Sequence, residues 1–92
     1  MLEKIENETF QGQTLQLDGK HFNNCHFVRC ILQYAGNAVV QLKKDSFAEC
    51  TFVFIDSARR TMQFISGLYQ SGAKQLVEDI FEDIRRGIFI SR

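Results

Sequence analysis

The chain has 92 residues, of which 45% are hydrophobic and 24% are charged. This composition excludes a disordered or low-complexity chain and predicts a single domain over residues 1–92. Lys and Arg together number 11, and so do Asp and Glu, so the formal net charge is zero. A neutral chain does not fit a dedicated nucleic-acid binder, because such proteins carry a basic excess that neutralises phosphates.

The beginning of the chain and its cysteines predict the compartment. Residues 1–8 are charged and lack the apolar segment of a signal peptide. The longest apolar run, around residues 53–55, is too short to span a bilayer, so we expect no membrane association. The three cysteines do not fit a framework of paired disulfides. Together these features favour the cytoplasm.

Large apolar residues recur every five positions between residues 15 and 55. Seven of the eight members of this series are Phe or Leu: Leu17, Phe22, Phe27, Leu32, Asn37, Leu42, Phe47 and Phe52. All three cysteines lie two positions before a member of the series, at Cys25, Cys30 and Cys50. Because strand side chains alternate with a period of two, each of these small residues points the same way as the large residue that follows. A period of five then predicts a bend in every segment, and four segments make a square coil.

These residues resemble the pentapeptide-repeat family. The resemblance rests on five segments: Lys20–Asn24, Cys25–Arg29, Cys30–Tyr34, Asp45–Glu49 and Cys50–Phe54. It implies a right-handed quadrilateral β-helix with the Phe or Leu and the small residue facing inward. The chain departs from the family pattern before the large residue, where His, Ile, Ser or Thr replaces the usual Asp or Asn. It departs again at residues 35–39, which lack a central apolar residue and predict a looser corner.

Four segments per coil place residues that are 20 positions apart above one another. The expected stacks are Phe22 on Leu42, Phe27 on Phe47, and Leu32 on Phe52. Arg29 then lies above Glu49 as a surface pair that contributes little stability. One outward face of the coil is apolar and needs a cover; its residues are Ile31, Tyr34, Val53 and Phe54.

From Asp56 onward the apolar residues follow a helical period. Ser57 predicts an N-cap, Ser71 and Gly72 predict a break, and Gly87 predicts the end of a second, amphipathic helix. We therefore expect a mainly β fold with C-terminal helices. Its expected parts are a right-handed β-helix of about two coils over residues 10–55, a helical hairpin over residues 57–87 that caps it, and an apolar tail at residues 88–92.

The cysteines and histidines between residues 21 and 30 have a spacing that invites a zinc site. In the five-residue register, however, Cys25 and Cys30 point inward while His21 and His26 point outward, so they cannot share one tetrahedral ion. Interior cysteines also lack the base and the exposure that a catalytic thiolate needs. No catalytic triad, phosphate-binding loop or dinucleotide motif is present. We therefore expect no metal, no cofactor and no enzyme activity.

Arg59 and Arg60 lie in the first turn of the first predicted helix, where cations oppose the helix dipole. Two interpretations remain open at this point. They are solvent-exposed arginines, or they form an anion site in which guanidinium groups and helix N–H groups bind a phosphate or carboxylate. Four further residues contribute to that site if a subunit interface brings them together: His26, Tyr34, Lys43 and Lys44.

Two functions fit these features. The first is a small non-catalytic interaction module that self-associates as a homodimer and holds a protein partner. The alternative is a sequestering binder of an anionic small molecule or nucleotide at a subunit junction, through Arg59 and Arg60. Open coil ends and uncovered apolar residues favour the first function. The expected interface residues are Ile31, Tyr34, Val53, Phe54, Ile88, Phe89 and Ile90.

Longer members of the family resemble duplex DNA, and this chain does not fit that role. Two coils rise only about 10 Å at the strand spacing of ~4.8 Å. One turn of DNA is roughly 34 Å long. The outward faces of the predicted coil are also not acidic.

Overall fold

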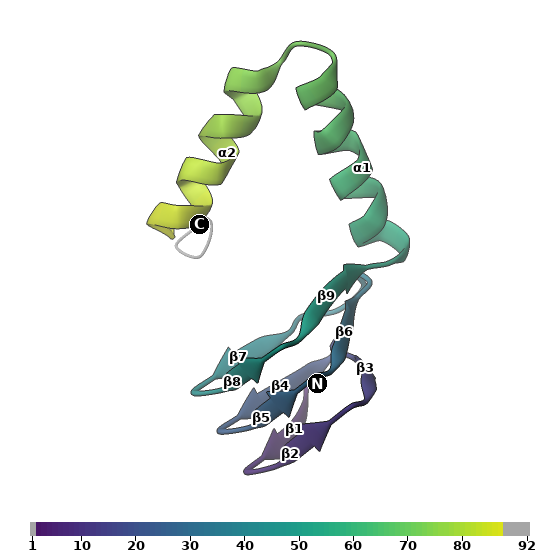
Figure 1. The fold of residues 1–92 in the computed structure, drawn as a ribbon, viewed down its shortest axis with the longest axis vertical. Helices are drawn as coiled ribbons and strands as arrows, with labels where there is room; N and C mark the ends of the chain where they lie inside the picture. Colours follow the sequence, from purple (N-terminus) through teal and green to yellow (C-terminus); the bar gives the residue numbers. More distant parts are fainter. Residues whose placement is uncertain (1, 88–92) are drawn as a thin grey trace. The chain divides into compact units, whose positions relative to one another are not determined.

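The structure is a computed structural model that describes residues 2–87. The chain divides into two compact units, Met1–Arg60 and Thr61–Arg92. All nine described strands belong to the first unit: β1 (Glu3–Glu6), β2 (Thr9–Gln11), β3 (Thr14–Gln16), β4 (Lys20–Asn23), β5 (His26–Val28), β6 (Ile31–Tyr34), β7 (Gln41–Lys43), β8 (Ser46–Ala48) and β9 (Thr51–Phe54). Two helices follow, α1 (Asp56–Gln70) and α2 (Lys74–Arg86). The expected class, mainly strands with two C-terminal helices, is confirmed (Figure 1).

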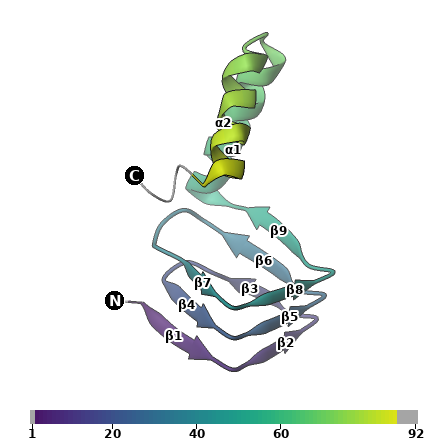
Figure 2. The ribbon, with the colours of Figure 1, turned by 90° about the vertical axis from the view of Figure 1, so that its left-hand side faces the viewer.

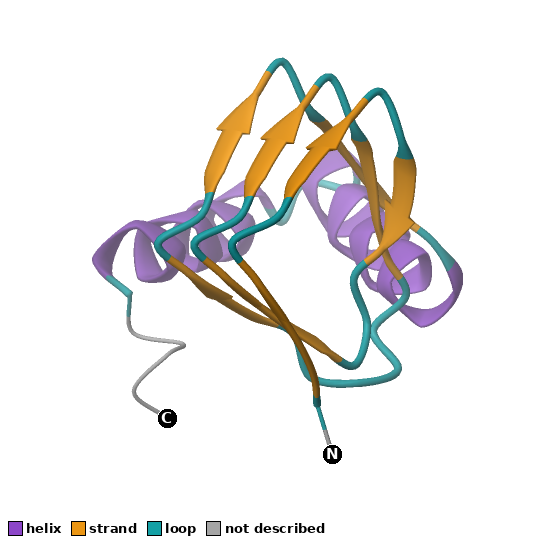
Figure 3. Ribbon diagram, turned by 90° about the horizontal axis from the view of Figure 1, so that it is seen from below, coloured by secondary structure: helices purple, strands orange, loops and turns teal. Residues whose placement is uncertain are grey.

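The strands form three parallel sheets of three strands each, in the orders β1-β4-β7, β2-β5-β8 and β3-β6-β9. The chain passes through the three sheets in turn and then returns to the first, and each such passage is called a circuit below. Figure 2 shows the three circuits stacked as layers, and Figure 3 shows the three sheets enclosing a common interior. Parallel stacking places the large residue of each strand above that of the strand before it.

The register confirms the expected stacks between the second and third circuits. Phe22 pairs with Leu42, Phe27 with Phe47, and Leu32 with Phe52. Between the first and second circuits the offset is 17 residues rather than 20, and the pairs are Ile5 with Phe22, Phe10 with Phe27, and Leu15 with Leu32.

The prediction of about two coils starting near residue 10 was therefore wrong, since the strands begin at Glu3 and make three circuits. The reason is a change of phase in the five-residue step. Ile5, Phe10 and Leu15 are five residues apart, but the series continues from Leu17, two residues later. The segments that close the first two circuits, residues 17–19 and 35–40, contain no strand, so a fourth sheet is absent from the described part of the chain.

Each circuit turns at residues with positive φ, and these residues occupy equivalent places in successive circuits. The three sets are Asn7, Asn24 and Lys44; Gly12, Arg29 and Glu49; and Gly19, Gly36 and Asp56. Glycine and asparagine adopt this left-handed conformation most readily. Side chains also meet at these corners: the Asn24 Nδ2 group donates to Asn7 Oδ1 at 2.8 Å, and Arg29 lies 4.0 Å from Glu49.

The interior is filled by Phe and Leu rings and by cysteine side chains. The core residues are Leu17, Phe22, Cys25, Phe27, Cys30 and Leu32. Each cysteine thiol donates to a backbone carbonyl of the circuit before it: Cys25 to Ile5 at 3.4 Å, Cys30 to Phe10 at 3.4 Å, and Cys50 to Phe27 at 3.3 Å. The inward orientation expected for the cysteines is confirmed. Cys25 and Cys30 are buried and Cys50 is half-buried.

Asp18 holds the irregular segment that closes the second circuit. Its carboxylate accepts backbone N–H groups from Ala35 at 2.7 Å, Asn37 at 2.9 Å and Ala38 at 3.3 Å. Desolvation raises the pKa of Asp18, but these three hydrogen bonds and one from its own backbone lower it by more, so the net pKa lies below the usual 3.8. Asp18 thus fixes the backbone of the segment that lacks a large apolar residue at Asn37.

The helices begin and end close to the predicted places. α1 begins at Asp56, and the Ala58 N–H donates to the Ala35 carbonyl at 2.9 Å. α2 ends at Arg86, and the next residue, Gly87, forms the predicted stop with a φ of 70° and an N–H bond to the Ile84 carbonyl at 3.1 Å. Neither helix of the described chain is long and apolar enough to cross a bilayer. The predicted tail at residues 88–92 lies outside the described residues.

Candidate functional site

The open end of the third circuit is the first candidate binding surface. β7, β8 and β9 are the last strands of their sheets, so one backbone edge of each is unpaired within the described chain. The inward residues of these strands, Leu42, Phe47 and Phe52, are 45%, 39% and 48% exposed. Their counterparts in the second circuit are buried, because a circuit lies on each side of them. We call these three residues the third-circuit end.

A hollow of about 320 Å³ continues from the third-circuit end into the first unit. Its walls are Leu17, Tyr34, Val40, Leu42, Phe52 and Phe54. The third circuit lacks a segment corresponding to residues 35–40, because the chain enters α1 at Asp56 instead. The walls are apolar apart from the Tyr34 hydroxyl, so the hollow suits an apolar side chain better than a charged ligand.

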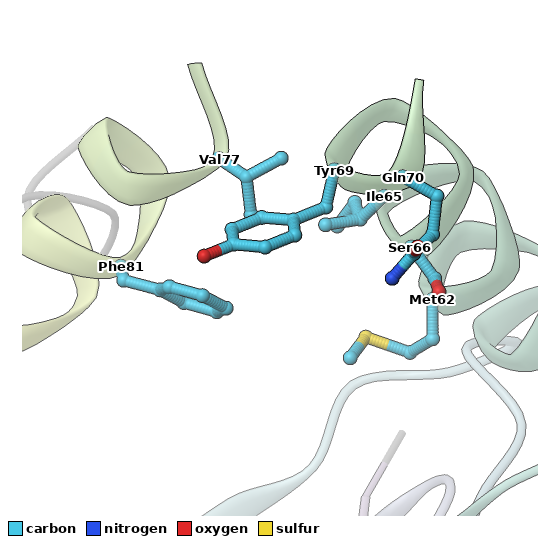
Figure 4. Close-up of a pocket in the computed structure, with 7 residues that line it drawn as sticks. All are labelled: Met62, Ile65, Ser66, Tyr69, Gln70, Val77 and Phe81. Atoms are coloured by element: carbon cyan, nitrogen blue, oxygen red, sulfur yellow. The ribbon is translucent and has the colours of Figure 1, made fainter. Parts of the chain in front are cut away.

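The second candidate surface is a groove of about 290 Å³ within the second unit, between α1 and α2. It is lined by Met62, Ile65, Ser66, Tyr69, Gln70, Val77 and Phe81, and Figure 4 shows the Tyr69 ring extending from α1 toward Val77 and Phe81. The Tyr69 hydroxyl donates to Glu78 Oε2 at 3.2 Å. This hydrogen bond and the charge of Glu78 raise the pKa of the Tyr69 phenol. We call this the hairpin groove.

The structure does not bring the predicted anion-binding residues together within one chain. Arg59 and Arg60 are exposed in the first turn of α1, and neither forms an ion pair with a described residue. Tyr34 lies beside the start of α1, because its carbonyl accepts the Ile55 N–H at 3.0 Å and the next residue, Ala35, bonds to Ala58. His26 is the first residue of β5, which belongs to another sheet than β7. Lys43 is the last residue of β7, and Lys44 follows it.

The predicted interface residues are divided between exposed and half-buried positions. Ile31 and Phe54 are exposed, while Tyr34 and Val53 are half-buried. Tyr34 and Phe54 are neighbours in the register of β6 and β9, and both line the hollow. The prediction that they share one outward face with Ile31 and Val53 was therefore wrong, because strand side chains alternate between the two sides of the sheet. The predicted contacts of Ile88, Phe89 and Ile90 lie outside the described residues.

The histidines and cysteines lie as the register predicted. Cys25 and Cys30 are buried, whereas His26 is exposed, and residues 2–87 hold no cluster of three or more His, Cys, Asp or Glu suited to a metal ion. His26 Nδ1 lies 2.6 Å from Ser46 Oγ on the outer face of β5 and β8. A serine and a histidine at this distance are two parts of a triad, but the described chain gives His26 no acidic partner.

Sequence reasoning expected open coil ends, but it did not name the residues of the third-circuit end, although a signal was present. The five-residue series stops at Phe52, and the next position is Ser57. The end of the series therefore marks the third circuit as the last one, whose large residues have no further described strand above them. The hairpin groove was signalled only by the number of apolar residues in both helices.

Comparisons with protein-family models, with curated proteins and with solved structures find no match to this chain. Both candidate surfaces are apolar and carry few polar groups. A lining of this kind favours packing against another apolar surface.

Proposed function

We propose that this protein is a small, non-catalytic binding module that self-associates and holds a protein partner. The observation that carries the proposal is the exposure of eleven large apolar side chains among the described residues, against nine buried hydrophobic residues. Single exposed apolar residues are ordinary, but contiguous patches of them mark interaction sites. Here they gather at the third-circuit end and on the helical hairpin.

A neutral chain also favours self-association. The 11 basic and 11 acidic residues leave no net repulsion between copies. Sedimentation equilibrium of the full chain at micromolar concentration tests the proposal. We expect the mass of a dimer, whereas a monomer mass at every concentration up to several hundred micromolar contradicts self-association. Deleting residues 88–92 in a parallel sample tests whether the predicted tail takes part.

We propose further that the strand-containing unit is a short right-handed β-helix of the pentapeptide-repeat kind. Support comes from the five-residue spacing, the 20-residue offset between the second and third circuits, and the equivalent positive-φ corners. The 17-residue offset of the first circuit is a departure from a uniform repeat. An experimental structure of the first unit tests both the handedness and the number of circuits.

A second candidate function is the binding of an anion by Arg59 and Arg60. The observation in its favour is that two adjacent, exposed guanidinium groups lie at the start of α1 without a carboxylate partner among the described residues. A thermal-shift screen against inorganic phosphate and nucleotides tests it. A rise in melting temperature that disappears in the Arg59→Gln, Arg60→Gln double variant supports anion binding, and no rise with any of them contradicts it.

A further inference from the structure

The helices of the second unit carry more apolar surface than one hairpin can cover. α1 presents Met62, Ile65 and Tyr69 to the hairpin groove, and α2 presents Val77 and Phe81. Each helix carries a further apolar stripe outside the groove. These stripes consist of Phe64 and Leu68 on α1, and Leu76, Ile80 and Ile84 on α2. We call these five residues the second apolar face.

Helical spacing shows that the two stripes belong to one face. At about 100° per residue, the stripe on α1 lies roughly 115° around its helix from the apolar residues of the groove, and the stripe on α2 lies roughly 80° around its helix from them. The two helices run in opposite directions, so the same rotation sense brings both stripes to one side of the hairpin. An apolar arc of this width needs two helical neighbours, as in a four-helix bundle, and the described chain supplies each helix with only one.

We propose that the second apolar face is the self-association surface, and that two hairpins from two copies pair across it as a four-helix bundle. This inference rests on the proposed self-association and names its surface. A second copy supplies the missing neighbour for both helices at once. Such pairing by a two-fold axis uses the same surface on both copies, and the neutral chain adds no net repulsion.

The most exposed residues of the second apolar face supply a large part of the apolar area that a stable dimer needs. Phe64, Leu76 and Ile84 are 66%, 61% and 59% exposed. At roughly 200 Å² for a large apolar side chain, these three leave on the order of 350 Å² open. A standard interface buries about 800 Å² per partner, a little over half of it apolar. The half-buried Leu68 and Ile80 lie between these residues and add to the same face.

The test is sedimentation equilibrium of the full chain and of four single variants. Phe64→Glu and Ile84→Glu place a charge in the proposed interface, and we expect each to weaken dimerisation at least tenfold. Gln63→Glu is the matched control, because it adds the same charge at an exposed neighbouring position outside the second apolar face. Phe52→Glu places a charge at the third-circuit end instead. The Gln63→Glu and Phe52→Glu variants should both remain dimeric.

The outcomes separate this inference from the proposed function. Dimeric Phe64→Glu and Ile84→Glu variants with wild-type affinity, beside a monomeric Phe52→Glu variant, overturn the hairpin interface and leave self-association in place. A monomeric wild-type chain overturns both. Hydrogen exchange of the wild-type chain above and below its dissociation constant needs no variant. Dimer-dependent protection of residues 61–87 supports the inference, and protection confined to residues 41–54 overturns it.

Discussion

The Phe27 ring lies parallel to the Phe47 ring, with centroids 5.1 Å apart and planes 6° apart. Phe10 extends the stack on the other side of Phe27, at 5.2 Å. One aromatic residue from each circuit therefore forms a continuous column through the interior. Phe27 is the middle member and is fully buried, while Phe47 is the last member and is 39% exposed.

Truncating the middle ring should cost more stability than truncating the last one. We expect Phe27→Ala to lower the free energy of unfolding by about 3–5 kcal/mol, through lost burial and a cavity between two rings. We expect Phe47→Ala to cost about 1–2 kcal/mol, because part of its ring is already in solvent. Urea unfolding followed by circular dichroism measures both. Equal losses, or a greater loss for Phe47→Ala, would show that the third-circuit end is covered in solution.

The three thiols should differ in reactivity according to their burial. Cys25 and Cys30 are buried and donate to backbone carbonyls, so we expect no labelling by a thiol reagent without denaturant. Cys50 is half-buried, and we expect it to be labelled first and slowly. The measurement is the number of thiols that react with time, by mass spectrometry. A Cys50→Ala variant that still reacts rapidly would contradict this order.

Asp18 should make stability depend on pH in the acid range. Its folded-state pKa is lower than the usual 3.8 that we assign to the unfolded chain. Its contribution is therefore complete above pH 3.8 and is lost as the pH falls through the lower, folded-state pKa. We expect Asp18→Ala to cost about 1–3 kcal/mol at pH 7, because the N–H groups of Ala35, Asn37 and Ala38 lose their acceptor.

The pH dependence itself provides the check on Asp18. Chemical unfolding of the wild type and of Asp18→Asn at several pH values between 2 and 7 measures it. The acid-dependent loss should be smaller in Asp18→Asn. Identical pH profiles for the two proteins would show that the carboxylate does not contribute in this way.

Gly36 and Gly12 both have a positive φ, but only Gly36 has neighbouring atoms close to the position that a Cβ would take. Substituting each by alanine therefore separates the cost of backbone strain from the cost of a steric contact. Gly36 has a φ of +78°, and a Cβ there would lie 3.3 Å from the Ala58 backbone nitrogen. Gly12 has a φ of +64°, and nothing lies within 4 Å of its Cβ position. We expect Gly12→Ala to cost about 1 kcal/mol from backbone strain alone, and Gly36→Ala to cost about 2 kcal/mol or more. Thermal unfolding compares them, and a smaller loss at Gly36 would contradict the contact with Ala58.

The sequence allowed the register of the second and third circuits to be predicted, because their large residues keep one five-residue phase from Phe22 to Phe52 on both sides of Asn37. The register of the first circuit was not predicted, and the reason is physical. Only seven residues separate Leu15 from Phe22, whereas ten separate Leu32 from Leu42, so the closing segment shifts the phase of the step.

Contacts of residues that lie outside the five-residue series were harder to predict than contacts of residues within it. Asp18 bonds to backbone groups 17 to 20 residues away, and nothing periodic in the sequence marks it. The helix bounds, by contrast, followed from the apolar spacing and from Gly87. The residues of the second apolar face also follow the helical spacing of apolar residues in the sequence. Only the structure shows which apolar residues line the hairpin groove and which lie outside it.

The equivalent corners bear on how a chain of this kind changes in length over evolution. Asn24 and Lys44 adopt nearly the same backbone conformation, with φ near 57° at both. Duplication of the codons for residues 24–43 would therefore insert one complete circuit and leave every corner angle as it was. The 17-residue first circuit shows that a loss of three residues is absorbed where no strand exists. Tandem duplication, followed by small deletions in the closing segments, is thus a route of descent that the backbone tolerates.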